Sequence, residues 1–499
     1  MSKRLFSDDY VHVGSVSKWH AWTDKPGMLH MPAYWENGNI FLANRQPLSH
    51  VDCFDELLTS IAGQQLYCFC DDMLQEQEFP FANQMLGSSQ SFPYLSRQGK
   101  ISALRLSQKR KSGFLIPASS WKYPGKPDAR LLRNVTRIFT EFGYEATTPS
   151  ALSEKIVRST LSTPLNISRP SVMLRRDILN NHRGGRIDLA KEERYYEQVF
   201  QYDENKSYLH HARRVVSPFI SPEIRTLPEW NECSAYATGY WHAYLQPVFC
   251  DIPPIQISGE TSRSSIEGWF WTEELQDCLD AGYSLLLIRE GYGFTETSDF
   301  LDPWASRLFE TYERLKAEEV DEHILDIVKA MMVGFPGRCL KAPEDYHLVP
   351  IEETQEGDIP LCFHWRNPED RKFTDFVIRP EYNKESAALS QVGSYIVMQC
   401  RRTLYHKMLA ESQAGNVVIS SYIDCFSVEL QTIAPEELGT QPGEWKEKKL
   451  VAVWAEQNRF VGKKPDGTPV MRAPGFDRSA RAAYWRRYRH ILRKLSDDS

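Results

Sequence analysis

The sequence lacks closely spaced metal-binding cysteines, long apolar runs and an excess of basic residues. Its ten cysteines are scattered, and the one close pair, Cys68 and Cys70, is not a CxxC pair. Neither a zinc site nor a disulfide framework is therefore expected, and reduced thiols of a cytoplasmic protein fit best. No run approaches the ~18 apolar residues that cross a bilayer, and the N-terminal MSKRLFSDDYVHVG lacks the apolar core of a signal peptide. We therefore expect a soluble protein with no membrane partner.

The lack of net positive charge excludes a global nucleic-acid signature but not a local basic face. The formal net charge is -7, with 41% hydrophobic and 25% charged residues, which is an ordinary globular composition. At 499 residues the chain is long enough for more than one core. One segment is strongly basic: residues 477–495 are predicted to form a helix in which Arg and Lys are interleaved with aromatic residues.

The apolar pattern predicts alternating helices and strands. Helical spacing occurs in 129–143, 272–282, 303–334 and 393–413, and strand-like runs occur at 66–70 and 101–107. We interpret 284–294 as a pair of strands, 338–392 as a β-rich insertion, and Gly282 as the C-cap of the helix before it.

Two strand-like runs end in an aspartate: QVFQYD ends at Asp203 and ISSYID ends at Asp424. One carboxylate from each of two adjacent strands can hold a pair of divalent ions for phosphoryl transfer. An Asp at a strand end is more often a turn residue or a helix cap, so the neighbouring residues have to decide.

These neighbours resemble, in chain order, the motifs of B-family DNA polymerases. DENKSY (203–208) resembles the first palm motif D-x-N-S-L-Y-P, and KAMMVGFPGR (329–338) resembles the fingers motif K-x-x-x-N-S-x-Y-G-K. GSYIVMQCR (393–401) resembles the helix before the third motif, and YIDCFS (422–427) resembles Y-x-D-T-D-S itself. HRGG (182–185) resembles the Y-x-G-G loop of the protein-primed polymerases of phages and linear plasmids, a type also found in organelles and viruses.

The resemblance runs from about residue 100 to 476 and implies an α/β (α+β) chain with a right-hand polymerase fold. Its palm, fingers and thumb would follow an N-terminal RNase H-like exonuclease-type domain. The implied domains are 1–170 (degenerate 3′–5′ exonuclease-like domain), 171–300 (first palm segment, with an insertion), 301–340 (fingers), 341–392 (β-rich insertion), 393–435 (second palm segment) and 436–499 (thumb and basic C-terminal helix).

The resemblance also implies roles for individual residues. Asp203 and Asp424 would be the catalytic residues and the metal ligands, because carboxylate oxygens suit two Mg²⁺ or Mn²⁺ ions. Tyr208, Asn205 and Lys329 would bind the incoming dNTP. DNA contacts are implied for Arg183, Gly184, Gly185, Arg186, Arg338, Arg401, Arg459, Arg486 and Arg487. The implied partners are a DNA template-primer, dNTPs and a terminal protein primer.

Each of these roles has an ordinary alternative. Tyr208 could be a core aromatic residue, and Lys329 could be a solvated cation on a helix. The Gly184–Gly185 pair could form a simple turn, and the basic C-terminal helix could be a solvated face.

The sequence departs from the family pattern at important positions. Phe426 stands where the second Asp of Y-x-D-T-D-S is the main metal ligand, and Phe cannot bind a cation. The two-residue period of a strand places Asp424 on the same face as Phe426, from which it could take over. Pro336 is expected to end the fingers helix early. The exonuclease motifs D-x-E and Y-x-x-x-D are absent, so proofreading is not expected. Carboxylates near the right strands are Asp8, Asp9, Asp71 and Asp72.

Two functions remain open. The first is a template-directed DNA polymerase of the protein-primed type that adds dNMPs and replicates a phage or mobile element. The second is a catalytically impaired, DNA-binding relative that acts as a replication accessory, scaffold or defence component. A reverse transcriptase is disfavoured because its palm hairpin needs two adjacent Asp residues, and Asp424 is followed by Cys425. Carboxylate oxygens of Asp203 and Asp424 within about 4–5 Å would favour the first function.

Overall fold

The structure is a computed structural model that describes residues 30–490. The ranges outside the description are 37–38, 46, 51–59, 62–63, 71–90, 96–100, 109–110, 124–125, 188–192, 256–264, 341–343, 351–354, 356–358, 364–371, 383–388, 457–458 and 473–482. Asp8, Asp9, Asp71 and Asp72 lie outside the described residues. Within them, no helix is both long and apolar enough to cross a membrane. The chain divides into two units, one of 1–164 with 306–389 and one of 165–305 with 390–499.

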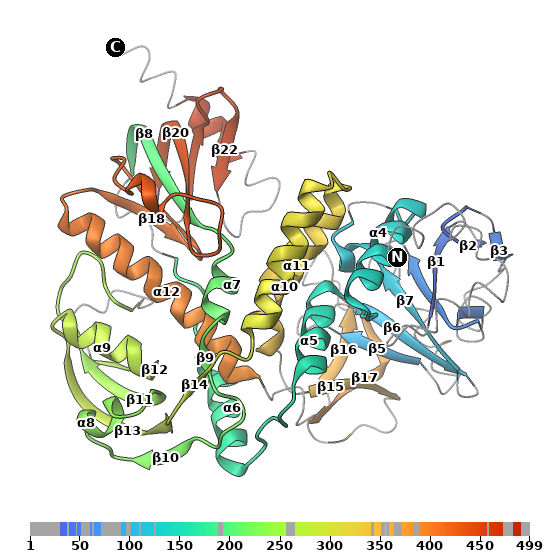
Figure 1. Ribbon diagram of the computed structural model, residues 1–499, viewed down its shortest axis with the longest axis horizontal. Coiled ribbons are helices and arrows are strands. Elements are labelled where there is room, and N and C mark those ends of the chain that lie inside the picture. The colour runs from blue at the N-terminus through green and yellow to red at the C-terminus, as the bar shows by residue number, and fades with distance from the viewer. Residues whose placement is uncertain are drawn as a thin grey trace. The chain divides into compact units, whose positions relative to one another are not determined.

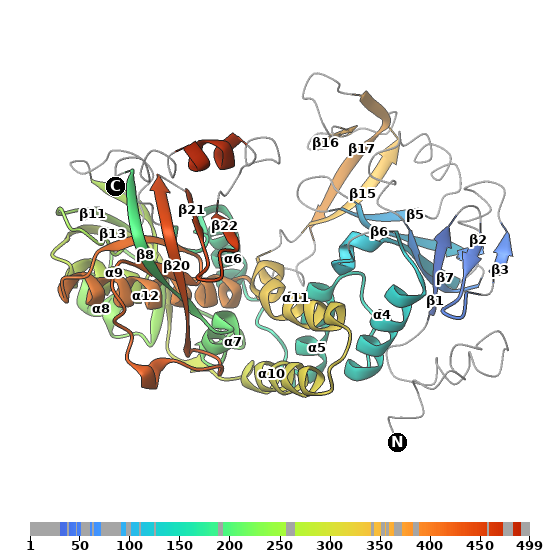
Figure 2. The same cartoon turned by 90° about the horizontal axis from the view of Figure 1, so that it is seen from above.

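The first unit is built on a seven-stranded mixed sheet with the strand order β3-β2-β1-β4-β7-β6-β5. Its strands are β1 (Met31–Glu36), β2 (Asn39–Phe41), β3 (Pro47–His50), β4 (Leu66–Cys70), β5 (Ser91–Leu95), β6 (Ile101–Gln108) and β7 (Lys111–Pro117). Strands β1, β4 and β7 are parallel, and β2 and β6 run antiparallel to them on either side (Figure 2). The edge strands β3 and β5 pair antiparallel with β2 and β6. A separate antiparallel sheet consists of β15 (Glu344–Pro350), β17 (Lys372–Tyr382) and β16 (Ile359–Phe363), all within the range 338–392.

The helices of this unit are α4 (Ala129–Phe142), α5 (Pro149–Thr160), α10 (Asp302–Ala317, which begins in the second unit) and α11 (Glu322–Cys339). Of these helices, α4 follows a predicted helical stretch, α5 was not predicted, and α10 and α11 divide one predicted stretch. The single helical stretch predicted over 303–334 is thus two helices, because Glu319 takes a φ of 50° and Asp321 caps α11 with its side chain.

Pro336 does not end α11, which continues to Cys339, so that expectation was wrong. The last turn is held by packing on α5. A Cβ at Gly334 would lie 2.8 Å from Ser150 Cβ, and Arg338 donates to Glu154 at 2.6 Å. This close contact of the two helices stabilises a helix end that a proline alone would disfavour.

The second unit contains a four-stranded antiparallel sheet with the order β10-β13-β11-β12. Its elements are β10 (Glu223–Thr226), α8 (Trp230–Ser234), β11 (Thr238–Gln246), β12 (Ile266–Trp271), α9 (Thr272–Asp280) and β13 (Ser284–Phe294); β9 (Val215–Val216) pairs with β14 (Thr297–Ser298). The predicted strand pair over 284–294 is the single strand β13. Gly291 and Gly293 do not mark a turn. A Cβ at Gly291 would lie 2.4 Å from Trp241, and a Cβ at Gly293 would lie 2.6 Å from Tyr236. The two glycines therefore make room for aromatic rings.

The other sheet of this unit carries both strand-end aspartates. Its order is β18-β19-β8-β20-β21-β22, all antiparallel, and Figure 1 shows β8 and β20 side by side within it. The strands are β8 (Arg194–Glu204), β18 (Val418–Tyr422), β19 (Cys425–Val428), β20 (Trp445–Glu456), β21 (Arg459–Lys463) and β22 (Pro469–Arg472). Helices α6 (Arg169–Asn181), α7 (Ser207–Ala212) and α12 (Ser390–Gln413) belong to the same unit, and α12 packs on the β18–β19 hairpin. Residues 483–490 form a helix whose Tyr484 and Tyr488 are buried against Val461 of β21.

Candidate active site

The register of the central sheet decides which side chains share a face. Strand β8 lies between β19 and β20, and Asp203 stands opposite Cys425 on one side and Lys446 on the other. Tyr202 stands opposite Phe426. Directly opposed residues point to the same face, and successive residues alternate. Asp203 and Cys425 therefore share one face, and Phe426 lies on the other.

Asp424 lies in the turn between β18 and β19 and not within a strand. Tyr422 pairs with Cys425, which leaves Ile423 and Asp424 as the tip of the hairpin. Ile423 has a φ of 60°, a strained value for a β-branched residue, and the Asp424 N–H donates to the Tyr422 carbonyl at 2.8 Å. This turn breaks the strand alternation. The expectation that Asp424 and Phe426 share a face was therefore wrong.

The turn brings Asp424 to Asp203. One ligand atom each of Asp203, Asp424 and Cys425 lies within 4.8 Å of the others. The Glu204 N–H also donates to the Asp424 carbonyl at 2.9 Å, which fixes the hairpin tip to the end of β8. The sheet thus brings together two carboxylates from residues that are far apart in the sequence. The Cys425 thiol is the third potential ligand of the group. Sequence reasoning did not single out Cys425, although it directly follows Asp424.

Phe426 is a core residue. Its side chain is fully buried and packs against Tyr202, Trp445 and the α12 residues Leu404 and Met408. The Phe426 ring meets the Tyr202 ring at 5.5 Å and the Trp445 ring edge-on at 5.4 Å. Phe426 therefore stabilises the sheet on α12 and does not fill a gap between the two aspartates.

A lysine that sequence reasoning missed also contacts the site. Lys448 Nζ lies 3.2 Å from Asp203 Oδ2, and both side chains are partly exposed. Lys448 comes from β20, two residues beyond Lys446 and so on the same face as Asp203. The alternating Lys446 and Lys448 are the signal in the sequence that could have predicted a cation here.

The predicted glycine loop supports the hairpin tip. The Ile423 N–H donates to the Arg186 carbonyl at 2.6 Å, and a Cβ at Gly185 would lie 3.1 Å from Ile423. At Gly184, a Cβ would meet nothing within 4 Å. Gly185 therefore allows the loop to approach the turn that carries Asp424, which is a local reason for glycine at this position.

The arginines around this loop are engaged within the protein. Arg186 is only 1% exposed, and its guanidinium donates to the carbonyls of Pro253 and Pro254. Arg186, which was predicted to contact DNA, therefore uses its guanidinium to bind backbone carbonyls inside the protein. Arg401 donates to the carbonyls of Arg183 and Gly184 at 2.6 and 2.9 Å and so holds the loop in place.

A buried glutamate links two of these arginines. Glu274 pairs with Arg183 at 2.8 Å and with Arg401 at 2.7 Å. Burial alone would raise the pKa of the Glu274 carboxyl, but the two guanidiniums hold it below its ordinary value. Burial and the nearby Arg401 charge lower the pKa of His182 to about 4, so this imidazole is neutral at physiological pH.

Tyr208 and Asn205 lie beside the carboxylates. Tyr208, in α7, is half-buried, and burial raises its pKa to about 12, with the Cys400 thiol and the Asp424 carboxylate adding to the shift. The Asn205 amide donates to the Gly439 carbonyl at 2.6 Å, and its backbone exchanges hydrogen bonds with Gly443 and Glu444. Asn205 therefore ties the end of β8 to the segment before β20.

The remaining predicted residues belong to other elements. Lys329 and Arg338 belong to the other unit, where Lys329 pairs with Asp326 at 3.3 Å and Arg338 with Glu154. Arg459 begins β21, and its side chain lies outside the described part of the structure. Arg486 is exposed, and Arg487 pairs with Glu193 at 3.2 Å on the surface.

Comparison with known proteins shows a similarity of fold. No family model matches the chain, and no curated protein matches it. Phi29 DNA polymerase complexed with primer-template DNA and incoming nucleotides is similar at a TM-score of 0.68 and 13% identity, covering 91% of this chain and 93% of that one. Its complex with single-stranded DNA gives 0.63 at 12% identity, covering 89% and 90%. Its orthorhombic crystal form gives 0.60 at 14% identity, also covering 89% and 90%. The chain thus has a mixed α/β fold that resembles Phi29 DNA polymerase over most of its length.

Proposed function

We propose that this chain is a template-directed DNA polymerase of the protein-primed B-family type, without proofreading, that replicates a phage or mobile element. The observation that carries the proposal is the approach of Asp203 and Asp424, whose carboxylate oxygens lie within 4.8 Å of each other. Asp203 comes from β8, and Asp424 comes from the tip of the β18–β19 hairpin, whose strand β19 pairs with β8. That arrangement meets the requirement for carboxylates that share divalent ions.

The donor set fits Mg²⁺ or Mn²⁺. The two carboxylates supply the hard oxygen ligands that both ions accept. The Cys425 thiol is a softer ligand than Mg²⁺ prefers, so its presence favours Mn²⁺ over Mg²⁺. When bound, a pair of such ions would lower the pKa of a primer hydroxyl and neutralise charge on the departing pyrophosphate. Asp203 and Asp424 would hold them.

Other side chains would position the substrates. Tyr208 would pack under the sugar of an incoming dNTP, and its hydroxyl stays protonated because its pKa is raised. Asn205 would keep the turn after Asp203 in place through its bond to Gly439. Lys329 would meet the triphosphate as a point charge, and Arg486 and Arg487 would contact DNA phosphates. A terminal protein is the proposed primer.

The second candidate function is a DNA-binding relative with impaired catalysis. Two observations favour it: among the described residues the site contains two carboxylates, and Lys448 already pairs with one of them at 3.2 Å. Such a protein would bind primer-template DNA as a replication accessory, scaffold or defence component without extending the primer.

Primer extension by the full-length protein with Mg²⁺ or Mn²⁺, with and without a chelator, tests the proposal. We expect chelator-sensitive dNMP addition that is faster with Mn²⁺. A protein that shifts primer-template DNA in a gel but adds no nucleotide with either ion would support the impaired relative.

Lys448→Gln should lower the Mg²⁺ concentration that gives half-maximal activity. The ammonium competes with a divalent ion for Asp203, and a partly exposed ion pair contributes up to about 1 kcal/mol, or about fivefold in affinity. Metal titrations of primer extension measure this. Lys449→Gln is the matched control, because Lys449 lies over the Phe200 ring on the opposite face. An unchanged midpoint in Lys448→Gln would exclude the competition.

Gly185→Ala should slow primer extension about tenfold, because small displacements of a catalytic group are costly. The new Cβ would meet Ile423 at 3.1 Å and push on the turn that carries Asp424. The matched control is Gly184→Ala, whose Cβ meets nothing within 4 Å. Steady-state rates at saturating dNTP and DNA compare the two. Equal rates in both variants would show that the loop does not position the hairpin.

A further inference from the structure

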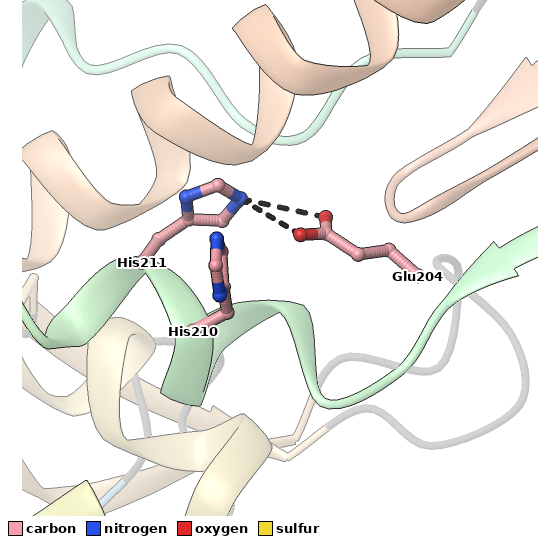
Figure 3. A group of neighbouring side chains, drawn as sticks. All are labelled: Glu204, His210 and His211. Atoms are coloured by element: carbon pink, nitrogen blue, oxygen red, sulfur yellow. Dashed lines mark hydrogen bonds and ion pairs between the residues drawn. The ribbon is translucent and has the colours of Figure 1, made fainter. Parts of the chain in front are cut away.

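A second group of three potential metal ligands lies where β8 ends and α7 begins. Glu204 is the last residue of β8, and His210 and His211 are neighbours in α7. One ligand atom of each lies within 4.8 Å of the others. Figure 3 shows the carboxylate and the two imidazoles facing one another across the turn. Since Glu204 follows Asp203 directly in the strand, its side chain points away from the Asp203–Asp424–Cys425 face.

The Glu204 carboxylate is buried, and among the described residues no Lys or Arg pairs with it. It is 3% exposed, and its side-chain partners among the described residues are the Ser207 hydroxyl at 2.6 Å and His211 Nε2 at 3.2 Å. A hydroxyl carries no charge, and an imidazole is positive only when protonated. An enclosed carboxylate in such surroundings is stabilised by a cation, which a divalent metal would supply.

The nearest pair already has the spacing of two ligands on one ion. In tetrahedral coordination with metal–ligand bonds of about 2.0–2.1 Å, two ligand atoms are roughly 3.3–3.4 Å apart. His211 Nε2 lies 3.2 Å from Glu204 Oε1. Thr403 of α12 contacts the same nitrogen at 3.3 Å and so helps to hold the ring in place.

His210 packs against the segment before β20. Its Nδ1 faces this segment, since a Cβ at Gly443 would lie 2.4 Å from that atom. Nε2 therefore lies on the far side of the ring, and Figure 3 shows one ring nitrogen of His210 directed towards His211.

We propose that Glu204, His210 and His211 form a binding site for a transition-metal ion of the Zn²⁺ class, with water completing the coordination. Two imidazoles and one carboxylate favour Zn²⁺ or Co²⁺ over Mg²⁺, which prefers oxygen ligands alone. The exposed His210 gives the ion a path from solvent. The cysteine pattern indicated no zinc site, but this ligand set contains no cysteine. The ion would cross-link the end of β8 to α7, and the proposal is independent of polymerase activity.

Metal binding by the full-length protein tests the proposal directly. The protein is stripped with a chelator and dialysed against buffered Zn²⁺, and bound metal is measured by mass spectrometry. Co²⁺ in place of Zn²⁺ reports the coordination geometry by its visible absorption. We expect about one tightly bound Zn²⁺ per chain, a tetrahedral Co²⁺ spectrum, and an affinity at least about tenfold lower in His210→Ala and His211→Ala.

Two control variants separate this site from others. Asp203→Ala removes a ligand of the neighbouring carboxylate site, and His406→Ala removes a histidine that also pairs with a carboxylate, Asp277, at 3.1 Å. Both should bind Zn²⁺ as wild type does. The proposal is overturned if wild type binds no Zn²⁺, if His210→Ala binds it unchanged, or if either control loses it. His210 is exposed, so its variant should keep the wild-type circular dichroism even if His211→Ala does not.

Discussion

Asp203→Asn and Asp424→Asn should each lower the rate of primer extension by at least about 100-fold. Either change removes one of the two carboxylates whose oxygens approach within 4.8 Å, and an amide oxygen carries no charge to hold a divalent ion. The loss should appear in the rate at saturating dNTP and DNA, and DNA binding in a gel shift should stay close to that of wild type.

The fold should survive both changes. Asp203 contributes a partly exposed ion pair with Lys448, which is worth at most about 1 kcal/mol. Asp280→Asn is the matched control and should leave the rate unchanged, because Asp280 is exposed and its carboxylate accepts a surface hydrogen bond from Gln276 at 2.7 Å. If both active-site variants extend primers as wild type does, these aspartates are not the centre of the reaction.

The strand-end aspartates show how far sequence reasoning could go. A carboxylate that follows an apolar run can be recognised in the sequence, and both Asp203 and Asp424 were found in this way. Their approach depends on β19 pairing directly with β8, a contact between residues more than 200 positions apart. Only the order of the motifs suggested that pairing, since the period of a single strand carries no information about its neighbour.

The hairpin tip could not be predicted from the strand period. Ile423 takes a φ of 60°, which the sequence gives no reason to expect of a β-branched residue. That one residue turns Asp424 out of the alternation, places Cys425 opposite Asp203, and sends Phe426 into the core. The Y-x-D-T-D-S pattern drew attention to Phe426, but the register shows that Cys425 is the residue opposite Asp203.

Charged and small residues were harder to interpret than apolar ones. The composition of the 182–186 loop suggested a phosphate contact, but Arg186 is buried with its guanidinium on two carbonyls. Residues 284–294 were predicted to be a pair of strands, but they form one strand in which Gly291 and Gly293 make room for Trp241 and Tyr236. In each case the tertiary neighbour decides the role, and the local sequence does not name that neighbour.

Phe426→Asp, which places the second Asp of the Y-x-D-T-D-S pattern at position 426, should destabilise the protein and should not increase its rate of primer extension. Loss of the buried ring alone should cost about 3–5 kcal/mol. The new carboxylate would lie among the buried side chains of Tyr202, Trp445 and α12, and burial of its charge there adds further cost. We expect a melting temperature lower by roughly 10 °C or more, measured by calorimetry. Phe426→Leu, which keeps the site apolar, should lose much less.

Cys425→Asp provides the decisive contrast, because Cys425 is the residue that faces Asp203. A third carboxylate there would be repelled by Asp203 and Asp424 until divalent ions bind, so added Mg²⁺ should raise the melting temperature of Cys425→Asp more than that of wild type. Mg²⁺ should not rescue Phe426→Asp, whose carboxylate lies on the other face. If Mg²⁺ instead raised the melting temperature of Phe426→Asp alone, the result would contradict the register described for β19. Position 426 would then be the one that faces the metal site.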